Sequence, residues 1–346
     1  MRLRWLILFT LTLSTVPVCL GLEIAQVGVY DFGVAYDIVY SDDIAYVSGN
    51  DGVDVFDVSD RMNPVKLTRI RNDEGAFGLA LQEDRLYIAG TGNGLFIVDV
   101  SDPRNPVVLG SAGIMATDVC VEGDYAYVAS GTSYSIIDVS DPEIPVITST
   151  VQGSGRSDHL KVLDDTLYLG ETNIGLKVYN VTDKTSPTYL KTVSGTTGIF
   201  DIKTDGAMMY LGCHGNGVKV LDVIDRNNPR VIGSFNNGGE AYGVHIIDNY
   251  LLVADLQQGI EILDIQNPES PSLLACWTGT HPHGVAGDSQ YIYLADQDDG
   301  LEIFIYGEGV EGSNQGTNRI PLSTLGIVMG IALVALAKKG SRNLFL

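Results

Sequence analysis

The chain has 346 residues, of which 45% are hydrophobic and 40 are glycine, and its formal net charge at pH 7 is −22. So negative a surface repels nucleic acid and anionic lipid, which argues against a nucleic-acid partner. The abundance of glycine suits many short strands joined by tight turns.

The N-terminus has the features of a secretory signal peptide. Arg2 and Arg4 precede an apolar run over residues 5–18, and Gly21 supplies a small residue for cleavage. These features predict a signal peptide over 1–21, a mature chain beginning at Leu22, and secretion.

One motif returns seven times between Ile44 and Phe304, with examples in GVDVFDVSD (52–60) and GLFIVDVSD (94–102). Successive anchor positions lie 42, 39, 42, 42, 42 and 41 residues apart, at Asp57, Asp99, Asp138, Asn180, Asp222, Asp264 and Ile305. A period near forty built from short β-like segments is typical of propeller blades.

The first block predicts four antiparallel strands, over 35–40, 44–48, 53–58 and 64–70, with turn residues at each break. The third strand is apolar on both faces, so both faces must be covered, as stacking around an axis would do.

Two residue types recur at fixed positions in the blocks. A glycine opens the third strand of six blocks, where a tight hairpin needs a positive φ: Gly52, Gly94, Gly175, Gly217, Gly259 and Gly300. A proline follows the anchor by seven residues in every complete block, which fits the start of an outer edge strand: Pro64, Pro106, Pro145, Pro187, Pro229 and Pro271. The anchor Asp, followed by Ser or Thr and a second Asp, indicates a turn capped by side chains.

The seventh block stops after its third strand, and residues 22–29 resemble the missing fourth. We therefore predict an all-β fold, a seven-bladed β-propeller of four-stranded antiparallel blades over 22–306. The N-terminal strand would close the ring and remove its open edges.

The C-terminus predicts a membrane attachment. A polar stalk over 307–319 precedes an apolar stretch over 320–337, which would span about 27 Å as a helix, close to a hydrocarbon core. Basic residues over 338–346 fit a cytoplasmic tail. The expected location is the outer face of the cell membrane, and a sorting signal removed after export or a buried core helix are the alternatives.

Three cysteines follow the signal peptide, Cys120, Cys213 and Cys276, and they occupy different repeat positions. No repeating disulfide framework is indicated, so we expect buried thiols.

The segment from Leu95 to Pro103 resembles the LVIVD repeat, a propeller repeat of bacterial and archaeal surface proteins, and 52–60 and 259–267 follow it closely. The resemblance covers about residues 30–306 and implies architecture and a surface location more than chemistry. Blocks three, four and seven depart from it, since they have Ser133 for the glycine, Asn180 for the anchor, and Ile305 for the anchor.

Candidate ligand or metal groups lie on the innermost strands. Aligned blocks place Asp37, Gly78, Asp118, His159, Asp201, Gly243 and Gly284 at equivalent positions. The candidate channel-side set is Asp37, Asp118, Asp158, His159, Asp201, His245, His281 and His283. Imidazoles and carboxylates converging on an axis could hold a divalent cation or polarise a substrate; alternatively, they cap exposed backbone.

Two further motifs carry possible chemistry. Asp296, Asp298 and Asp299 precede Gly300 and resemble half of a calcium loop, although the later bidentate acid is missing and a solvated turn is the alternative. Asn180 begins an Asn-Val-Thr glycosylation sequon.

The leading function hypothesis is a cell-surface binding or adhesion module for an extracellular protein or glycan, using variable loops on one face of the ring. The alternatives are an extracellular hydrolase or lyase with the Asp/His set as its site, and a structural component of a surface layer. No nucleophile elbow, phosphate loop or zinc-protease motif is present in the sequence, which favours binding over catalysis.

Overall fold

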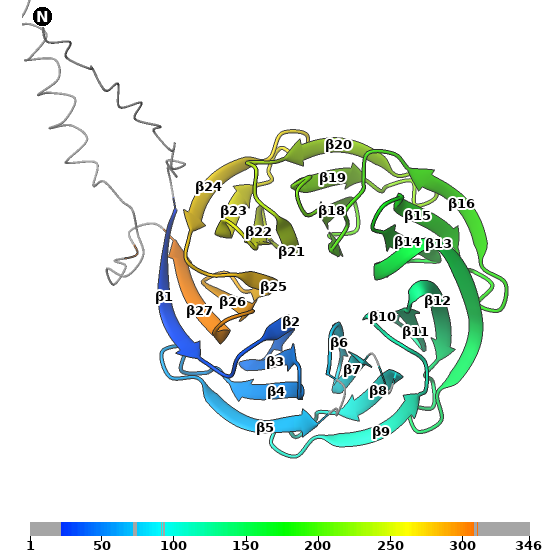
Figure 1. Ribbon diagram of the computed structural model, residues 1–346, viewed down its shortest axis with the longest axis horizontal. Helices are drawn as coiled ribbons and strands as arrows, with labels where there is room; N and C mark the ends of the chain where they lie inside the picture. The colour runs from blue at the N-terminus through cyan, green and yellow to red at the C-terminus, as the bar shows by residue number, and fades with distance from the viewer. Residues whose placement is uncertain (1–21, 72–74, 91, 93, 308–309, 311–346) are drawn as a thin grey trace, which may run out of the picture. The chain divides into compact units, whose positions relative to one another are not determined.

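The computed structural model describes residues 22–71, 75–90, 92, 94–307 and 310, and every regular element among them is a β-strand. The strands form sheets arranged in a ring, as Figure 1 shows. The all-β propeller architecture is therefore confirmed. The predicted signal peptide, the residues from 311 onward and most of the predicted stalk lie outside the described residues.

Five sheets have four strands each. In sheet order, the first three are β2 (Ala35–Ser41), β3 (Ile44–Gly49), β4 (Gly52–Asp57), β5 (Val65–Arg71); β6 (Leu79–Gln82), β7 (Arg85–Gly90), β8 (Gly94–Asp99), β9 (Val107–Ala112); and β17 (Asp201–Thr204), β18 (Met208–Gly212), β19 (Val218–Asp222), β20 (Arg230–Phe235). The other two are β21 (Ala241–Ile247), β22 (Tyr250–Asp255), β23 (Gly259–Asp264), β24 (Ser272–Trp277); and β25 (Pro282–Gly287), β26 (Tyr291–Asp296), β27 (Gly300–Gly307), β1 (Glu23–Tyr30).

The sixth sheet has seven strands, so the prediction of seven separate four-stranded blades is wrong. Its strands, in order, are β10 (Asp118–Glu122), β11 (Tyr125–Ala129), β12 (Gly131–Asp138), β13 (Val146–Leu163), β14 (Thr166–Glu171), β15 (Gly175–Asn180) and β16 (Thr188–Val193). The 18 residues of β13 run without a break from the outer strand of block three into the inner strand of block four.

The missing glycine of block three explains the fusion. With Ser133 in its place, the positive φ of the hairpin moves to Gly131 (φ 73°), and β12 begins there. Gly131 then pairs with Ser157, and Ser157 also pairs with Glu171 of β14. Because Ser157 belongs to both ladders, the chain never leaves the sheet between the two blocks.

The predicted closure of the ring by the N-terminal strand is confirmed. β1 pairs antiparallel with β27 from Glu23 opposite Gly307 to Tyr30 opposite Leu301. Ile24 and Ala25 of β1 are buried. Across the closure, the Gln26 Nε2 donates to Glu302 Oε1 at 2.6 Å.

The recurrent glycines and prolines have the predicted roles. All six glycines that open third strands have positive φ, between 67° and 119°. A Cβ on Gly94 would lie 2.0 Å from the carbonyl oxygen of Ala112, so only glycine fits there. Each recurrent proline immediately precedes its fourth strand, as Pro64 precedes Val65.

The predicted side-chain-capped turns are also confirmed. The anchor side chain accepts the amide N–H two residues later in all six complete blocks, for example Asp99 Oδ1 from Ser101 at 2.9 Å. The second Asp or Asn repeats the pattern, as Asp102 does with Arg104. Hydrogen bonds from Ser101 lower the pKa of Asp99, which keeps the capping carboxylate ionised.

The hydrophobic core lies between successive sheets. Tyr46, Val53 and Val55 of the first sheet pack against Leu86 and Ile88 of the second, and equivalent clusters follow around the ring. Full burial of an aliphatic side chain contributes about 1.5–3 kcal/mol. Both faces of each third strand thus contribute, as the sequence pattern requires.

The predicted membrane helix is not part of this fold. Over the described ranges the structure contains no helix of the length and apolar character needed to cross a bilayer. The apolar stretch 320–337 that prompted the prediction lies outside those ranges.

The three cysteines are free thiols. Cys120 and Cys213 are buried, as expected, and burial raises the pKa of each to about 12. Cys276 is only partly buried.

Deleting residues 22–30 should lower the melting temperature of the protein by at least about 5 °C, because β27 loses its partner strand and Ile24 its burial. Thermal unfolding followed by circular dichroism measures the change. A synthetic peptide of residues 22–30 should restore part of the loss. An unchanged melting temperature in the deletion variant would show that β1 does not hold the ring closed.

Stability should fall as pH rises through the neutral range because of Glu302. Burial, then the negative charges of Asp296 and Asp299, raise its pKa from 4.5 to about 8. Between these values the unfolded chain releases a proton that the folded protein retains, so folding is progressively disfavoured as pH rises. The melting temperature of Glu302→Gln relative to wild type should therefore increase from pH 5 to pH 9. The exposed Glu143→Gln is the control, and a pH-independent difference for Glu302→Gln would contradict this assignment.

Candidate functional site

The first strands of the blocks lie nearest the axis of the ring, as Figure 1 shows for β2, β6, β10, β21 and β25. Each contacts the next in a closed circuit that runs β2, β6, β10, β13, β17, β21, β25 and back to β2. Side chains from all seven blocks therefore gather around the axis.

Three of the candidate carboxylates join neighbouring inner strands. Each accepts the amide N–H of its own next residue and a second amide from the following block. The second bonds are Asp37 from Leu79 at 2.8 Å, Asp118 from Leu160 at 3.0 Å, and Asp201 from Val244 at 2.9 Å. The alternative that these residues cap backbone groups describes what their carboxylates do.

Lys203, which the sequence reasoning missed, supplies the positive charge among these carboxylates. Its Nζ lies 3.0 Å from Asp201 Oδ1. Burial opposes the charge, but Asp201 and Asp37 outweigh it and raise the pKa of Lys203. Burial raises the pKa of Asp37 and of Asp118 to about 6. For Asp201, burial opposes ionisation, yet Lys203 and the Val244 amide hold its pKa below the usual value.

The candidate histidines do not form one group. Burial lowers the pKa of His159, whose Nδ1 lies 3.9 Å from Asp118 Oδ2. Burial lowers the pKa of His245 and of His283 to about 4, so both are neutral at physiological pH. His281 is exposed and pairs instead with Asp298, at 2.7 Å between Nδ1 and Oδ2.

The candidate calcium turn is held by backbone hydrogen bonds. Asp296 is buried, and its Oδ1 accepts the amides of Asp298 and Asp299 while its Oδ2 accepts that of His281. In the part of the chain that the structure describes, no group of three or more His, Cys, Asp or Glu side chains is placed to hold a metal ion. Asn180 is half-buried, and its Oδ1 accepts the Thr182 amide.

A second ring of residues lies one position before the aligned set. It consists of Tyr36, Phe77, Thr117, Asp158, Phe200, Tyr242 and His283, and we call it the axial rim. Five of these seven side chains are aromatic. In four blocks the inner strand has an irregular register at this point, for example between Ala241 and Gly243. A bulge of this kind re-aims a side chain.

The five aromatic rings form a continuous arc. Tyr36 stacks on Phe77 with centroids 4.8 Å apart, and Tyr242 stacks on His283 at 4.6 Å. Tyr36 and His283 are 6.1 Å apart, and Tyr242 and Phe200 4.5 Å. All five side chains are half-buried. Shifting the block alignment by one residue would have revealed this arc, of which the sequence analysis included only His283.

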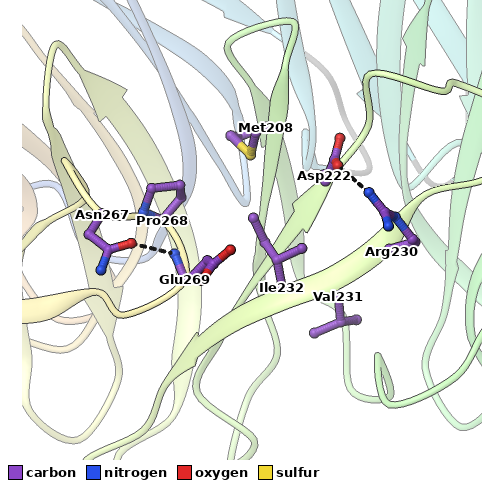
Figure 2. A pocket seen from close by; sticks show the side chains of 8 residues that line it. All are labelled: Met208, Asp222, Arg230, Val231, Ile232, Asn267, Pro268 and Glu269. Atoms are coloured by element: carbon purple, nitrogen blue, oxygen red, sulfur yellow. Dashed lines mark hydrogen bonds and ion pairs between the residues drawn. The ribbon is translucent and has the colours of Figure 1, made fainter.

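Two cavities lie away from the candidate set. The larger, of about 420 Å³, is at the outer side of the ring between β20 and the turn at Asn267–Glu269. Figure 2 shows Met208 and Ile232 facing it, with the Asp222–Arg230 ion pair to one side. The other, of about 320 Å³, is lined by Phe32, Asn50 and Arg69 among others. It adjoins the axial rim, because the Tyr36 hydroxyl donates to Asn50 Oδ1 at 2.7 Å.

Comparison with known proteins identifies the repeat. The model of the LVIVD repeat matches residues 32–70, 75–114, 113–152 and 238–277. None of the curated proteins matches this sequence.

Solved structures show the same fold at low sequence identity. The crystal structure of the computationally designed Ika8 protein is 11% identical with a TM-score of 0.62, over 82% of this chain and 100% of that chain. The WD40 β-propeller domain of Doa1 is 13% identical with a TM-score of 0.64, over 82% and 96%. At these identities the likeness is one of fold alone.

Replacing Asp118 with Ala should lower the free energy of unfolding by about 1–3 kcal/mol, because the buried amides of Leu160 and Val119 lose their acceptor. Asp118→Asn should cost less, since an amide oxygen still accepts. The midpoint of denaturant unfolding at constant m-value measures both. The exposed Asp84→Ala is the control. Equal stability of Asp118→Ala and wild type would show that the carboxylate does not join the two blocks.

Proposed function

The chain carries LVIVD repeats folded into a β-propeller, and from this premise we propose that it is a binding protein whose ligand contacts the axial rim. The observation that carries the proposal is the aromatic arc. Four blocks contribute a Tyr or Phe and a fifth contributes His283 at one equivalent position around the axis.

The rim has the properties of a contact surface. Tyr and Phe supply large contact areas at a small entropic cost, because each has only two side-chain torsions to fix. Mutual stacking holds these rings in place before a ligand arrives, as Tyr36 with Phe77 and Tyr242 with His283 illustrate. Aromatic anchors of this kind carry most of the energy at binding interfaces.

The charged layer beside the rim supports binding over catalysis. Asp37, Asp118 and Asp201 each use their carboxylate oxygens to accept backbone amides. A general acid or base needs an oxygen that can reach a substrate proton. These carboxylates are engaged in holding the inner strands together.

The proposed ligand is an extracellular protein or glycan, and the proposed location is outside the cell. The signal-like N-terminus supports export, and the net charge of −22 disfavours nucleic acid. Propeller architecture supports the binding role, since it presents loops from many repeats at one face.

Replacing Tyr36 and Tyr242 with Ala together should weaken ligand capture at least about thirtyfold, the loss expected when a buried aromatic anchor is truncated. Beads coated with the full-length protein, and their adhesion to intact cells of the producing organism, provide the assay. Tyr189→Ala on β16, an exposed aromatic at the outer side of the ring, is the matched control. Wild-type adhesion by the double variant would overturn the rim as the binding surface.

A further inference from the structure

The aromatic arc has one polar gap. Between Phe77 and Phe200 the axial rim carries Thr117 and Asp158. Phe77 stacks on Tyr36, and no second aromatic ring contacts it among the described residues. Phe200 lies 5.8 Å from His159 at the other side of the gap. Aromatic surface therefore borders the polar gap on both sides.

Unpartnered buried polar atoms concentrate at this gap. Among the described residues, the Ser130 hydroxyl, the Ser157 hydroxyl and Oδ1 of Asp158 have no hydrogen-bond partner. Ser157 is 0% exposed and Asp158 is 7% exposed. A buried polar atom without a partner is costly and indicates that something else, such as a water molecule or a ligand, satisfies it.

The three groups belong to one cluster. Pairing of Gly131 with Ser157 brings Ser130 next to the strand that carries Asp158. The Thr117 hydroxyl lies 3.4 Å from the carbonyl oxygen of Asp158 and 3.2 Å from that of Ala129, the residue before Ser130. The gap thus results from the same fusion of blocks three and four that produced the seven-stranded sheet.

The charge of the cluster is already balanced. Arg156 Nε lies 2.5 Å from Oδ2 of Asp158, leaving Oδ1 as an acceptor within a neutral pair. A cationic ligand would compete with this guanidinium. An anionic ligand would meet Asp37, Asp118 and Asp201, which Lys203 only partly offsets.

We propose that this gap binds a neutral carbohydrate, an inference that rests on the axial rim as the binding surface. Sugar hydroxyls both donate and accept, which matches two serine hydroxyls beside a carboxylate oxygen that only accepts. The C–H faces of a sugar ring pack against aromatic rings such as Phe77 and Phe200. One ligand would satisfy all three orphaned atoms.

The test measures binding of defined oligosaccharides to the full-length protein by calorimetry. The neutral probes are maltohexaose, cellohexaose, mannohexaose and xylohexaose, and the charged probes are polygalacturonate and a chitosan hexamer. At least one neutral probe should bind, with an affinity that salt does not change. The double variant Ser130→Ala/Ser157→Ala should bind it at least about tenfold more weakly.

Stability separates a binding role from a structural one. Because the unpartnered hydroxyls are costly, the same double variant should melt at the wild-type temperature or higher without ligand. Ser111→Ala, at an exposed position on β9, is the matched control for both measurements. A double variant that binds as well as wild type would overturn the proposal, and so would binding confined to charged probes.

Failure of this inference is distinguishable from failure of the proposed function. If no neutral probe binds, but Tyr36→Ala/Tyr242→Ala still abolishes adhesion to cells, the carbohydrate is wrong and a protein becomes the ligand. If neither substitution set changes adhesion, both proposals fail.

Discussion

The close approach of seven inner strands around one axis is the constraint on which the rest of this structure depends. A Cβ on Gly78 would lie 2.7 Å from the Cα of Asp118, and one on Gly284 would lie 2.9 Å from the Cα of Asp37. Only glycine allows the backbones so close. Asp37, Asp118 and Asp201 then use that proximity, because each reaches an amide of the next block.

The same constraint separates the roles of adjacent residues. At the aligned position the carboxylates are engaged with backbone, and their charge is partly balanced by Lys203. One residue earlier, the irregular register turns a second side chain toward the rim. Stability is thus carried by one layer and the proposed contact surface by the next, so substitutions in the two layers can be distinguished by experiment.

The fusion of blocks three and four links a change in local turn chemistry to the proposed site. Loss of one glycine at position 133 moved the hairpin to Gly131 and drew Ser157 into two ladders. In most blocks the chain leaves the sheet at this point, whereas here a continuous strand holds Ser157 and Asp158 in buried positions with unsatisfied atoms. A departure from the repeat therefore coincides with the one polar interruption of the aromatic arc.

The repeat period, the glycines, the prolines and the capped turns were predictable from sequence, because each follows from local backbone chemistry. Ring closure was predictable for a related reason: a block lacking its fourth strand needs a partner, and residues 22–29 had the pattern to supply it. The fusion within β13 was not predicted, since its signal was a single missing glycine whose consequence depends on pairing across two blocks. Nor could spacing show which axial groups meet. The paired roles of Asp118 and Leu160, the position of Lys203 and the stacking of Tyr242 on His283 depend on residues about forty positions apart, and only the closed ring brings them together.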